Sequence, residues 1–307
     1  MTPESVQNIN DRQNDAEHIR LLHAADVEHA QAQRVESARW LVAFIVSVAS
    51  LAAVLIPDLR PAAAITGVIA TVLTETVWPF VTKNFNNRAV LIQEQFDTSL
   101  FQIPWNPDLG HRVPLVHIVD SAKKYCKDKK RNWYLDVRGI PSPIAETLCQ
   151  RENLIWDADQ REAWAWRLVA GLAAWLGIGL IISLAVQWYV WQLLVWYIAP
   201  TLPAASLALR SLLQQRSVAR TKIDLRERID EALQSLTPEG VSQPKLDELT
   251  EALRLRQDKI FRSRLDSARV PERFYDRLRD RFETNHQIEA EHFKSIWADE
   301  RDRSQED

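Results

Sequence analysis

A single carboxylate, Glu75, lies inside a long apolar stretch of the sequence. Thr71, Trp78 and Thr82 accompany it at spacings of four, three and four residues, which places all four side chains on one face of a helix. A carboxylate within a bilayer is costly unless it is paired, protonated or in contact with water. The stripe therefore has two interpretations. It lines a polar path between subunits, or Glu75 holds neighbouring helices together by hydrogen bonding.

A second group of residues, between positions 105 and 161, combines aromatic, basic and amide side chains. Aromatic faces stack on nucleobases, guanidinium groups bind phosphates, and Asn or Gln side chains bond base edges. Such a mixture suits a small nucleotide ligand, and it also suits a domain held by buried aromatic rings and Arg–Asp bridges. The candidate ligand-binding residues are Trp105, Asn106, Arg131, Asn132, Trp133, Tyr134, Gln150, Arg151, Asn153, Trp156, Asp157 and Arg161.

No catalytic or metal-binding motif accompanies these residues. The sequence contains no glycine-rich phosphate loop, no His-Glu-x-x-His, no Gly-x-Ser-x-Gly and no Cys-x-x-Cys. The histidines at positions 18, 23 and 29 do not share a helical face. The net charge of −3 gives no indication of binding to a nucleic-acid polymer. We therefore predict a protein that is not an enzyme and has no cofactor and no metal site.

Two apolar hairpins, residues 40–81 and 168–209, must position the stripe. The first is interrupted at residues 56–61 and the second, weakly, at Gln187 and Trp188. Each half has about 17–22 residues, enough helix to cross a hydrocarbon core roughly 30 Å thick. A soluble helix of this length should have a polar face, and these stretches show almost none. Four transmembrane helices are expected, and two buried hairpins of a soluble bundle are the alternative.

The charges around the hairpins predict their orientation. Nine basic residues flank the side that holds both termini and the central segment, whereas the two turns on the other side carry Arg60 alone. The positive-inside rule places both termini and the central segment in the cytoplasm. Tryptophan and tyrosine residues cluster where the second hairpin meets the two membrane surfaces, as in an interfacial aromatic belt.

The predicted fold is therefore an all-α membrane protein. A mostly helical cytoplasmic domain separates the two hairpins, and a helical cytoplasmic region follows them. The predicted order is an N-terminal helix (1–39), hairpin 1 (40–82, with spans 40–56 and 62–82), a central domain (83–166), hairpin 2 (167–209, with spans 167–187 and 189–209) and a C-terminal region (210–307). Within these regions we expect helices near 84–101, 114–127, 144–150, 244–266 and 271–303, and a kink at Pro200 and Pro203.

An ordered set of short motifs resembles the SMODS-associated four-transmembrane effector family. The resemblance covers nearly the whole chain, and each motif alone is short. Leu135 follows one motif where the family pattern leads us to expect proline. The motifs are residues 8–14, 96–97, 103–106, 131–134, 149–153, 156–157 and 255–261, together with Arg264, Pro271, Tyr275 and Arg279.

The resemblance implies a role in bacterial anti-phage defence by abortive infection. Such effectors are associated with a cyclic-oligonucleotide synthase. The implied mechanism is that the messenger binds the cytoplasmic part and that the protein, as a homo-oligomer in the inner membrane, opens a pore or disrupts the bilayer. The resemblance thus implies a cyclic oligonucleotide and the lipid bilayer as partners. The alternative is a non-conducting membrane scaffold that recruits a protein through its C-terminal helices, and a small transporter is a third class.

Overall fold

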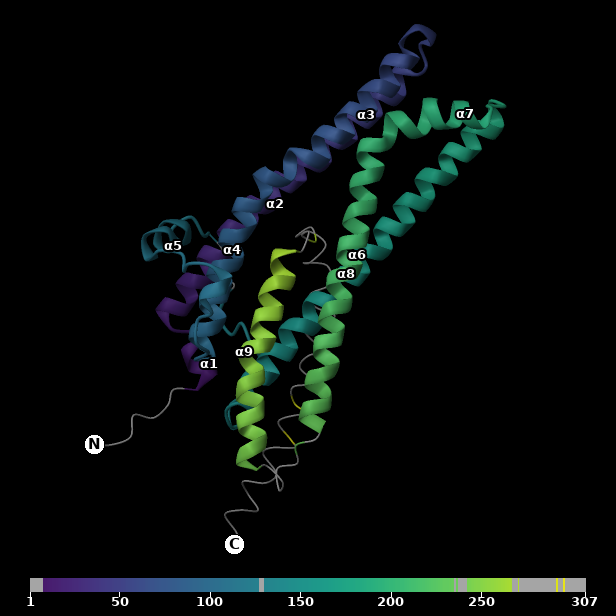
Figure 1. Ribbon diagram of the computed structural model, residues 1–307. Coiled ribbons are helices and arrows are strands. Elements are labelled where there is room, and N and C mark those ends of the chain that lie inside the picture. Colours follow the sequence, from purple (N-terminus) through teal and green to yellow (C-terminus); the bar gives the residue numbers. More distant parts are fainter. Residues whose placement is uncertain are drawn as a thin grey trace, which may run out of the picture. The chain divides into compact units, whose positions relative to one another are not determined.

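Helices are the regular elements of the chain, in agreement with the all-α prediction. The computed structural model describes residues 8–126, 130–234, 236, 242–266, 270, 291 and 295, and the described residues contain no strand. The predicted helix at 271–303 lies almost wholly outside them. The elements, shown in Figure 1, are α1 (Ile9–Arg12), α2 (Ala16–Ala53), η1 (Pro57–Leu59), α3 (Arg60–Thr76), α4 (Trp78–Leu100), η2 (Pro107–Leu109), α5 (Leu115–Ala122), α6 (Ile144–Ala185), α7 (Val190–Leu193), η3 (Leu194–Ile198), α8 (Ala199–Gln234) and α9 (Gln243–Leu265).

Three helical stretches of the described chain are long and apolar enough to cross a membrane. They are Ala16–Ala53, Ile144–Ala185 and the run Val190–Gln234, which joins α7, η3 and α8. The remaining apolar stretch forms α3, whose 17 residues extend about 25 Å, slightly less than the roughly 30 Å of a hydrocarbon core. α4 begins directly afterwards at Trp78, with Pro79 in its first turn.

Local chemistry closes both turns between apolar helices. After α2 ends, the Nε of Arg60 donates a hydrogen bond of 3.0 Å to the backbone oxygen of Val54. After α6 ends, Gln187 takes a left-handed conformation (φ 57°), and the Trp188 N–H donates to the Ser183 oxygen at 2.8 Å. Each device provides a partner for a carbonyl group that a helix C-terminus leaves without a donor.

The chain folds into two units that draw on the same helices. Unit 1 contains the described parts of Met1–His29, Asn87–Gln160 and Val218–Asp307, and unit 2 contains Ala30–Asn86 and Arg161–Ser217. α2, α4, α6 and α8 each contribute residues to both units. Each of these helices continues where its side chains change from polar to apolar, because no glycine or proline interrupts the helix at that point.

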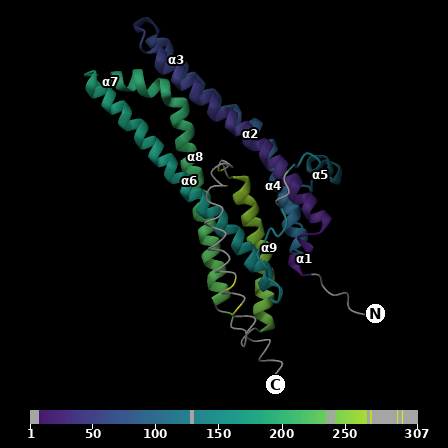
Figure 2. The same ribbon diagram turned by 180° about the vertical axis from the view of Figure 1, so that it is seen from behind.

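Unit 2 has polar groups inside and apolar groups outside. Its buried polar residues include Ser47, Thr74 and Thr201, whereas Phe44, Ile181 and Leu184 are 61%, 67% and 70% exposed. Figures 1 and 2 show α3 lying beside the C-terminal half of α2. An exposed apolar surface of this extent is typical of a protein whose solvent is lipid.

Proline in α8 creates a close helix crossing in unit 2. Pro203 has no N–H for the carbonyl group of Ala199, one helical turn earlier. Gly67 of α3 packs against that carbonyl group, so closely that a Cβ atom at Gly67 would lie 2.2 Å from the Ala199 oxygen. The Ser47 hydroxyl accepts a hydrogen bond of 3.2 Å from the N–H of Ala204, next to the proline. The helix is π-type at Leu194–Ile198, just before this crossing, and continues through Pro203.

The crossing predicts opposite effects for two glycine substitutions. Gly67→Ala should force α3 away from Ala199 and destabilise the protein by about 1–3 kcal/mol, the usual cost of overpacking. Gly171→Ala is the matched control, because a Cβ atom there meets nothing within 4 Å, and alanine favours a helix. Thermal unfolding of the detergent-solubilised protein measures both. Equal midpoints for the two variants would contradict this packing.

Candidate functional site

Three amide side chains near the N-terminus hold the segment at residues 132–137. The Asn10 side chain donates to the Leu135 oxygen at 3.0 Å and accepts from the Val137 N–H at 2.9 Å. Gln13 accepts from the Tyr134 N–H at 2.8 Å, and Asn14 accepts from the Asn132 N–H at 3.0 Å. These amide side chains bond backbone groups of the segment as a neighbouring β-strand would. The first sequence motif, residues 8–14, therefore fixes the position of the central motif.

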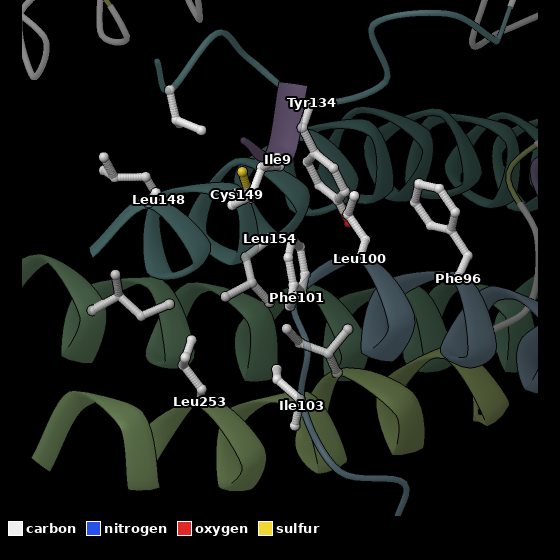
Figure 3. Close-up of a cluster of buried hydrophobic side chains, with 14 of the residues drawn as sticks. Ile9, Phe96, Leu100, Phe101, Ile103, Tyr134, Leu148, Cys149, Leu154 and Leu253 are labelled. Carbon is white, nitrogen blue, oxygen red and sulfur yellow. The ribbon is translucent and has the colours of Figure 1, made fainter. Parts of the chain in front are cut away.

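Tyr134 carries this segment into the centre of unit 1. Figure 3 shows its ring among apolar residues that include Phe101 and Leu154. Its hydroxyl donates to Asp97 Oδ1 at 2.8 Å, and Arg264 Nη1 donates to Asp97 Oδ2 at 2.6 Å. Asp97 and Arg264 are both buried. Removing one partner of such a buried ion pair is strongly destabilising, although the intact pair need not be more stabilising than two apolar residues.

The network extends through a second carboxylate, Glu94, one turn before Asp97 on α4. Gln257 Nε2 donates to Glu94 at 2.8 Å and to Asp97 at 3.1 Å. Arg254 donates to Glu94 at 2.8 Å and to the Pro104 oxygen at 2.9 Å. Arg254 also pairs with Asp258, which accepts a hydrogen bond of 2.8 Å from Asn106. α4, α9 and the loop after α4 are thereby joined by polar contacts.

α6 supplies the remaining members of this buried polar network. Gln150 Nε2 donates to the Leu253 oxygen at 3.1 Å and to Gln257 Oε1 at 3.0 Å. Asn153 donates to the Tyr134 hydroxyl at 3.2 Å. Four of the predicted ligand-binding residues, Asn106, Tyr134, Gln150 and Asn153, thus belong to one hydrogen-bond network in unit 1.

Burial shifts the proton affinities of several groups in unit 1. Burial and then the neighbouring Asp97 raise the pKa of Glu94 to about 7. Burial raises the pKa of Glu152 to about 7, although the Leu135 N–H donates to its carboxylate at 2.9 Å. Burial, followed by the charge of Asp97, also raises the pKa of the Tyr134 hydroxyl well above its usual value. The raised pKa values of Glu94 and Glu152 therefore lie close to neutral pH.

The other predicted ligand residues are dispersed. Arg151 pairs with Asp230, and Asp157 pairs with the buried Lys222. Asn132 takes a left-handed conformation (φ 53°), and Arg131 beside it is exposed. Arg161 belongs to unit 2, where it donates to Gln215 at 2.7 Å.

The three tryptophans of the predicted set are all partly exposed. Lys130 lies 4.6 Å from the ring centroid of Trp133. Arg112 lies 5.4 Å from that of Trp105, whose indole N–H donates to the Gly110 oxygen. Trp156 is carried by α6 in unit 1. Aromatic–cation pairs at Trp105 and Trp133 are the features of this set that most resemble a stacking surface.

In unit 2, Glu75 forms ion pairs with two arginines. Its carboxylate oxygens lie 3.1 Å from Arg39 Nη2 and 2.7 Å from Arg210 Nη1, which joins α3 to α2 and α8. Arg39 also lies 3.4 Å from Glu36. We call these four residues the charge cluster.

Two other residues of the polar stripe have described hydrogen bonds. The Trp78 indole donates to the Val35 oxygen at 3.2 Å, and the Thr71 hydroxyl bonds its own helix at the Gly67 oxygen. The side chain of Thr82 lies outside the described ones.

A comparison of the sequence with models of protein families identifies the family to which this chain belongs. The model of the SMODS-associating 4TM effector domain matches residues 7–293, nearly the whole chain. The chain belongs to this effector-domain family. A curated protein of Bacillus cereus (strain VD146), named a probable CBASS effector molecule, is 24% identical over 199 residues, which are 60% of this chain and 67% of that protein. No solved structure matches the chain.

Within this effector-domain family, Leu135 has a local explanation. Its N–H donates to Glu152, a bond that proline, which has no N–H, does not form.

Sequence reasoning missed the acids at the centre of the site. Glu94 and Asp97 appeared only as part of a helix or a family motif, although they occupy the same face as the buried Val90 and Phe101. Those four positions follow one another at helical spacings of four, three and four residues. Two acids on an apolar face require buried partners, and that signal could have identified them.

We predict that the Asp97–Arg264 pair determines the stability of unit 1. Asp97→Asn removes the carboxylate charge that lies 2.6 Å from the buried Arg264 and should cost about 3–5 kcal/mol. Tyr134→Phe removes one neutral hydroxyl from the same carboxylate and should cost about 1 kcal/mol. Thermal unfolding in detergent compares them. A loss for Tyr134→Phe as large as that for Asp97→Asn would contradict the assignment.

The raised pKa of Glu152 predicts a pH dependence. The folded state holds this proton up to about pH 7, whereas the unfolded chain releases it near the ordinary value of 4.5. Stability should therefore fall as the pH rises from about 4.5 to 7, by up to about 3 kcal/mol. Glu152→Gln retains an acceptor for Leu135 and should flatten the curve of unfolding midpoint between pH 5 and 8, leaving the slope that Glu94 contributes. Parallel curves for the two proteins would exclude this role.

Proposed function

We propose that the protein is an effector of a cyclic-oligonucleotide anti-phage system of the CBASS type. It senses the nucleotide with unit 1 and permeabilises the bacterial inner membrane with unit 2. The observation that carries the proposal is the convergence of family motifs from residues 8–14, 131–134, 149–153 and 255–261 on one buried polar network. Motifs so distant in sequence gather when they serve one site. The curated relative named a probable CBASS effector molecule supports the same assignment.

In the proposed topology, four spans cross the membrane as two hairpins. α3 together with the first turns of α4 makes the second crossing, and both termini and the segment between the hairpins face the cytoplasm. The exposed apolar side chains of unit 2 and its interior serines and threonines support this placement. The asymmetry of basic residues between the two sides supports the orientation.

Messenger binding acts through the helices that the two units share. A ligand shifts a conformational equilibrium only by binding one state more tightly than the other. α2, α4, α6 and α8 supply residues to both units, so a change in unit 1 alters segments that continue into unit 2. In the proposed mechanism the altered subunits associate, and the stripe at Thr71, Glu75, Trp78 and Thr82 faces the path between them.

The sensor residues separate into two groups under this proposal. Arg131 and Trp133 are accessible and supply a guanidinium and an aromatic face for the ligand, as does the Trp105–Arg112 pair. Arg151 and Asp157 are committed to ion pairs with Asp230 and Lys222, and they shape the site rather than contact the nucleotide.

Binding and leakage measured on one preparation test the function. The purified full-length protein is titrated with a panel of cyclic di- and trinucleotides and then placed in dye-filled liposomes. We expect one nucleotide to bind and to release the dye. Binding without leakage would indicate the non-conducting scaffold instead, and neither binding nor leakage would overturn the proposal.

The charge cluster predicts a change in gating. In the resting state Glu75 pairs with both Arg39 and Arg210, so Glu75→Gln leaves these two arginines with Glu36 as the single acid of the charge cluster. Glu75→Gln should therefore raise dye release in the absence of nucleotide, with nucleotide affinity unchanged. Glu162→Gln, at an exposed site on α6, is the control. If the two variants release dye at the same rate, both with and without nucleotide, Glu75 has no role in gating.

A further inference from the structure

Arg256 of α9 differs from the buried arginines Arg39 and Arg264. It is 9% exposed, yet no carboxylate among the described residues lies within ion-pair distance of it. Its Nε and Nη2 donate to the backbone oxygens of Ala252 and Leu249 at 3.2 and 3.3 Å, and its Nη1 makes no hydrogen bond. Arg264 and Arg39, in contrast, each have an acidic partner.

The guanidinium of Arg256 nevertheless remains charged. Burial alone lowers its pKa to about 10, which is still well above neutral pH. A buried cation normally has a counter-charge, because removal from water is costly. Arg256 thus offers a positive charge and an unused donor inside unit 1.

A second unmatched polar group, on α6, contacts the same turn of α9. Gln150 is fully buried, and its Nε2 donates to the Leu253 oxygen while its Oε1 has no donor. The Leu253 carbonyl group that Gln150 binds is adjacent in sequence to the Ala252 carbonyl group that Arg256 binds. An unused cationic donor and an unused acceptor are therefore held over one turn of the helix.

We propose that Arg256 and Gln150 form a binding site for a nucleotide phosphodiester, with Arg256 on the phosphate and Gln150 Oε1 on an adjacent hydroxyl or amine. This inference rests on the proposed function and assigns its ligand contact. Guanidinium groups bind phosphate oxygens strongly and with defined geometry. Because both side chains are buried, the ligand reaches them only when α9 shifts from α6, so binding is coupled to a rearrangement of unit 1.

Substitution of Arg256 tests the site directly. The full-length protein in detergent is titrated with inorganic phosphate and, separately, with 3′,3′-linked cyclic di- and trinucleotides. Phosphate should raise the unfolding midpoint of the unsubstituted protein but not of Arg256→Gln. Nucleotide affinity should fall at least about tenfold in Arg256→Gln and less in Arg256→Lys. Arg262→Gln, at an exposed position of the same helix, is the control and should bind as the unsubstituted protein does.

A second pair of variants keeps Arg256 in place. Ala252→Glu puts a carboxylate four residues before Arg256, the favourable orientation for a helical ion pair, and Ala252→Gln has the same size without the charge. Ala252→Glu should unfold at a higher temperature than Ala252→Gln and bind the nucleotide about tenfold more weakly. Equal midpoints and equal affinities for this pair would overturn the proposal, even if Arg256→Gln fails to fold.

The outcomes separate this site from the proposed function. If no cyclic nucleotide binds but phosphate stabilises the unsubstituted protein and not Arg256→Gln, the anion site stands and the messenger is wrong. If nucleotide binds equally to the unsubstituted protein, Arg256→Gln and Ala252→Glu, the function stands and the site is wrong. Stabilisation by a soluble short-chain phosphatidylglycerol, and not by nucleotides, would assign the phosphodiester to lipid and overturn the nucleotide assignment.

Discussion

The ion pair between Asp97 and Arg264 is the interaction on which unit 1 depends. It joins α4 to the last turn of α9, and both charges are almost completely removed from water. Neither charge is tolerable in this core without the other. Tyr134 and Gln257 donate to the same carboxylate, so the central segment and α6, through Gln150, are ordered by the same pair. A network of this kind forms as a whole, because each partial version leaves a buried group unsatisfied.

In unit 2 the buried polar groups that must be accommodated are mainly backbone carbonyl groups. Its helices are apolar outside, so a carbonyl group that loses its helical donor cannot turn to water. Pro203 creates that situation at Ala199, and the close approach of Gly67 covers the carbonyl group. Nearby, the Tyr197 hydroxyl donates to the Trp175 oxygen at 2.7 Å, and the Trp175 indole donates to Thr201. Tyr197, one of the aromatic residues attributed from the sequence to a membrane interface, thus joins Trp175 in tying α6 to η3 and the start of α8.

The sequence predicted the helical class and the family because those properties are encoded locally, in apolar runs and short motifs. It also indicated the turns near Pro57 and Gln187, where proline or a weak break interrupts the runs. It also indicated a helix that leads from the N-terminal region into the first span, as α2 does, but not that α6 runs unbroken through the expected boundary near residue 166. A change from polar to apolar side chains does not end a helix whose backbone bonds remain intact.

The candidate site was predictable only in part, because its chemistry is set by long-range pairing. Composition selected Tyr134, Gln150 and Asn153, which do gather in one network, but it also selected Arg161, which belongs to the other unit. It overlooked Glu94 and Asp97, since an acid on a helix is ordinarily read as solvent-exposed. Whether a charged residue is buried depends on a partner far away in sequence, and a single sequence does not show that partner.

Satisfied and unsatisfied polar groups have different consequences for a switch. Asp97 and Tyr134 have hydrogen-bond partners in this conformation, and Arg264 has an acidic partner, so all three favour this conformation. Arg256 Nη1 and Gln150 Oε1 have no hydrogen-bond partner in this conformation. A ligand that supplied a phosphate and a donor would gain the free energy of those missing hydrogen bonds. A ligand that binds only there gains its affinity from a state in which α6 and α9 have separated, and it therefore favours that state over the present one. In the proposed switch, the strongly paired residues set how much binding free energy the change requires, and Arg256 and Gln150 are where the ligand supplies it.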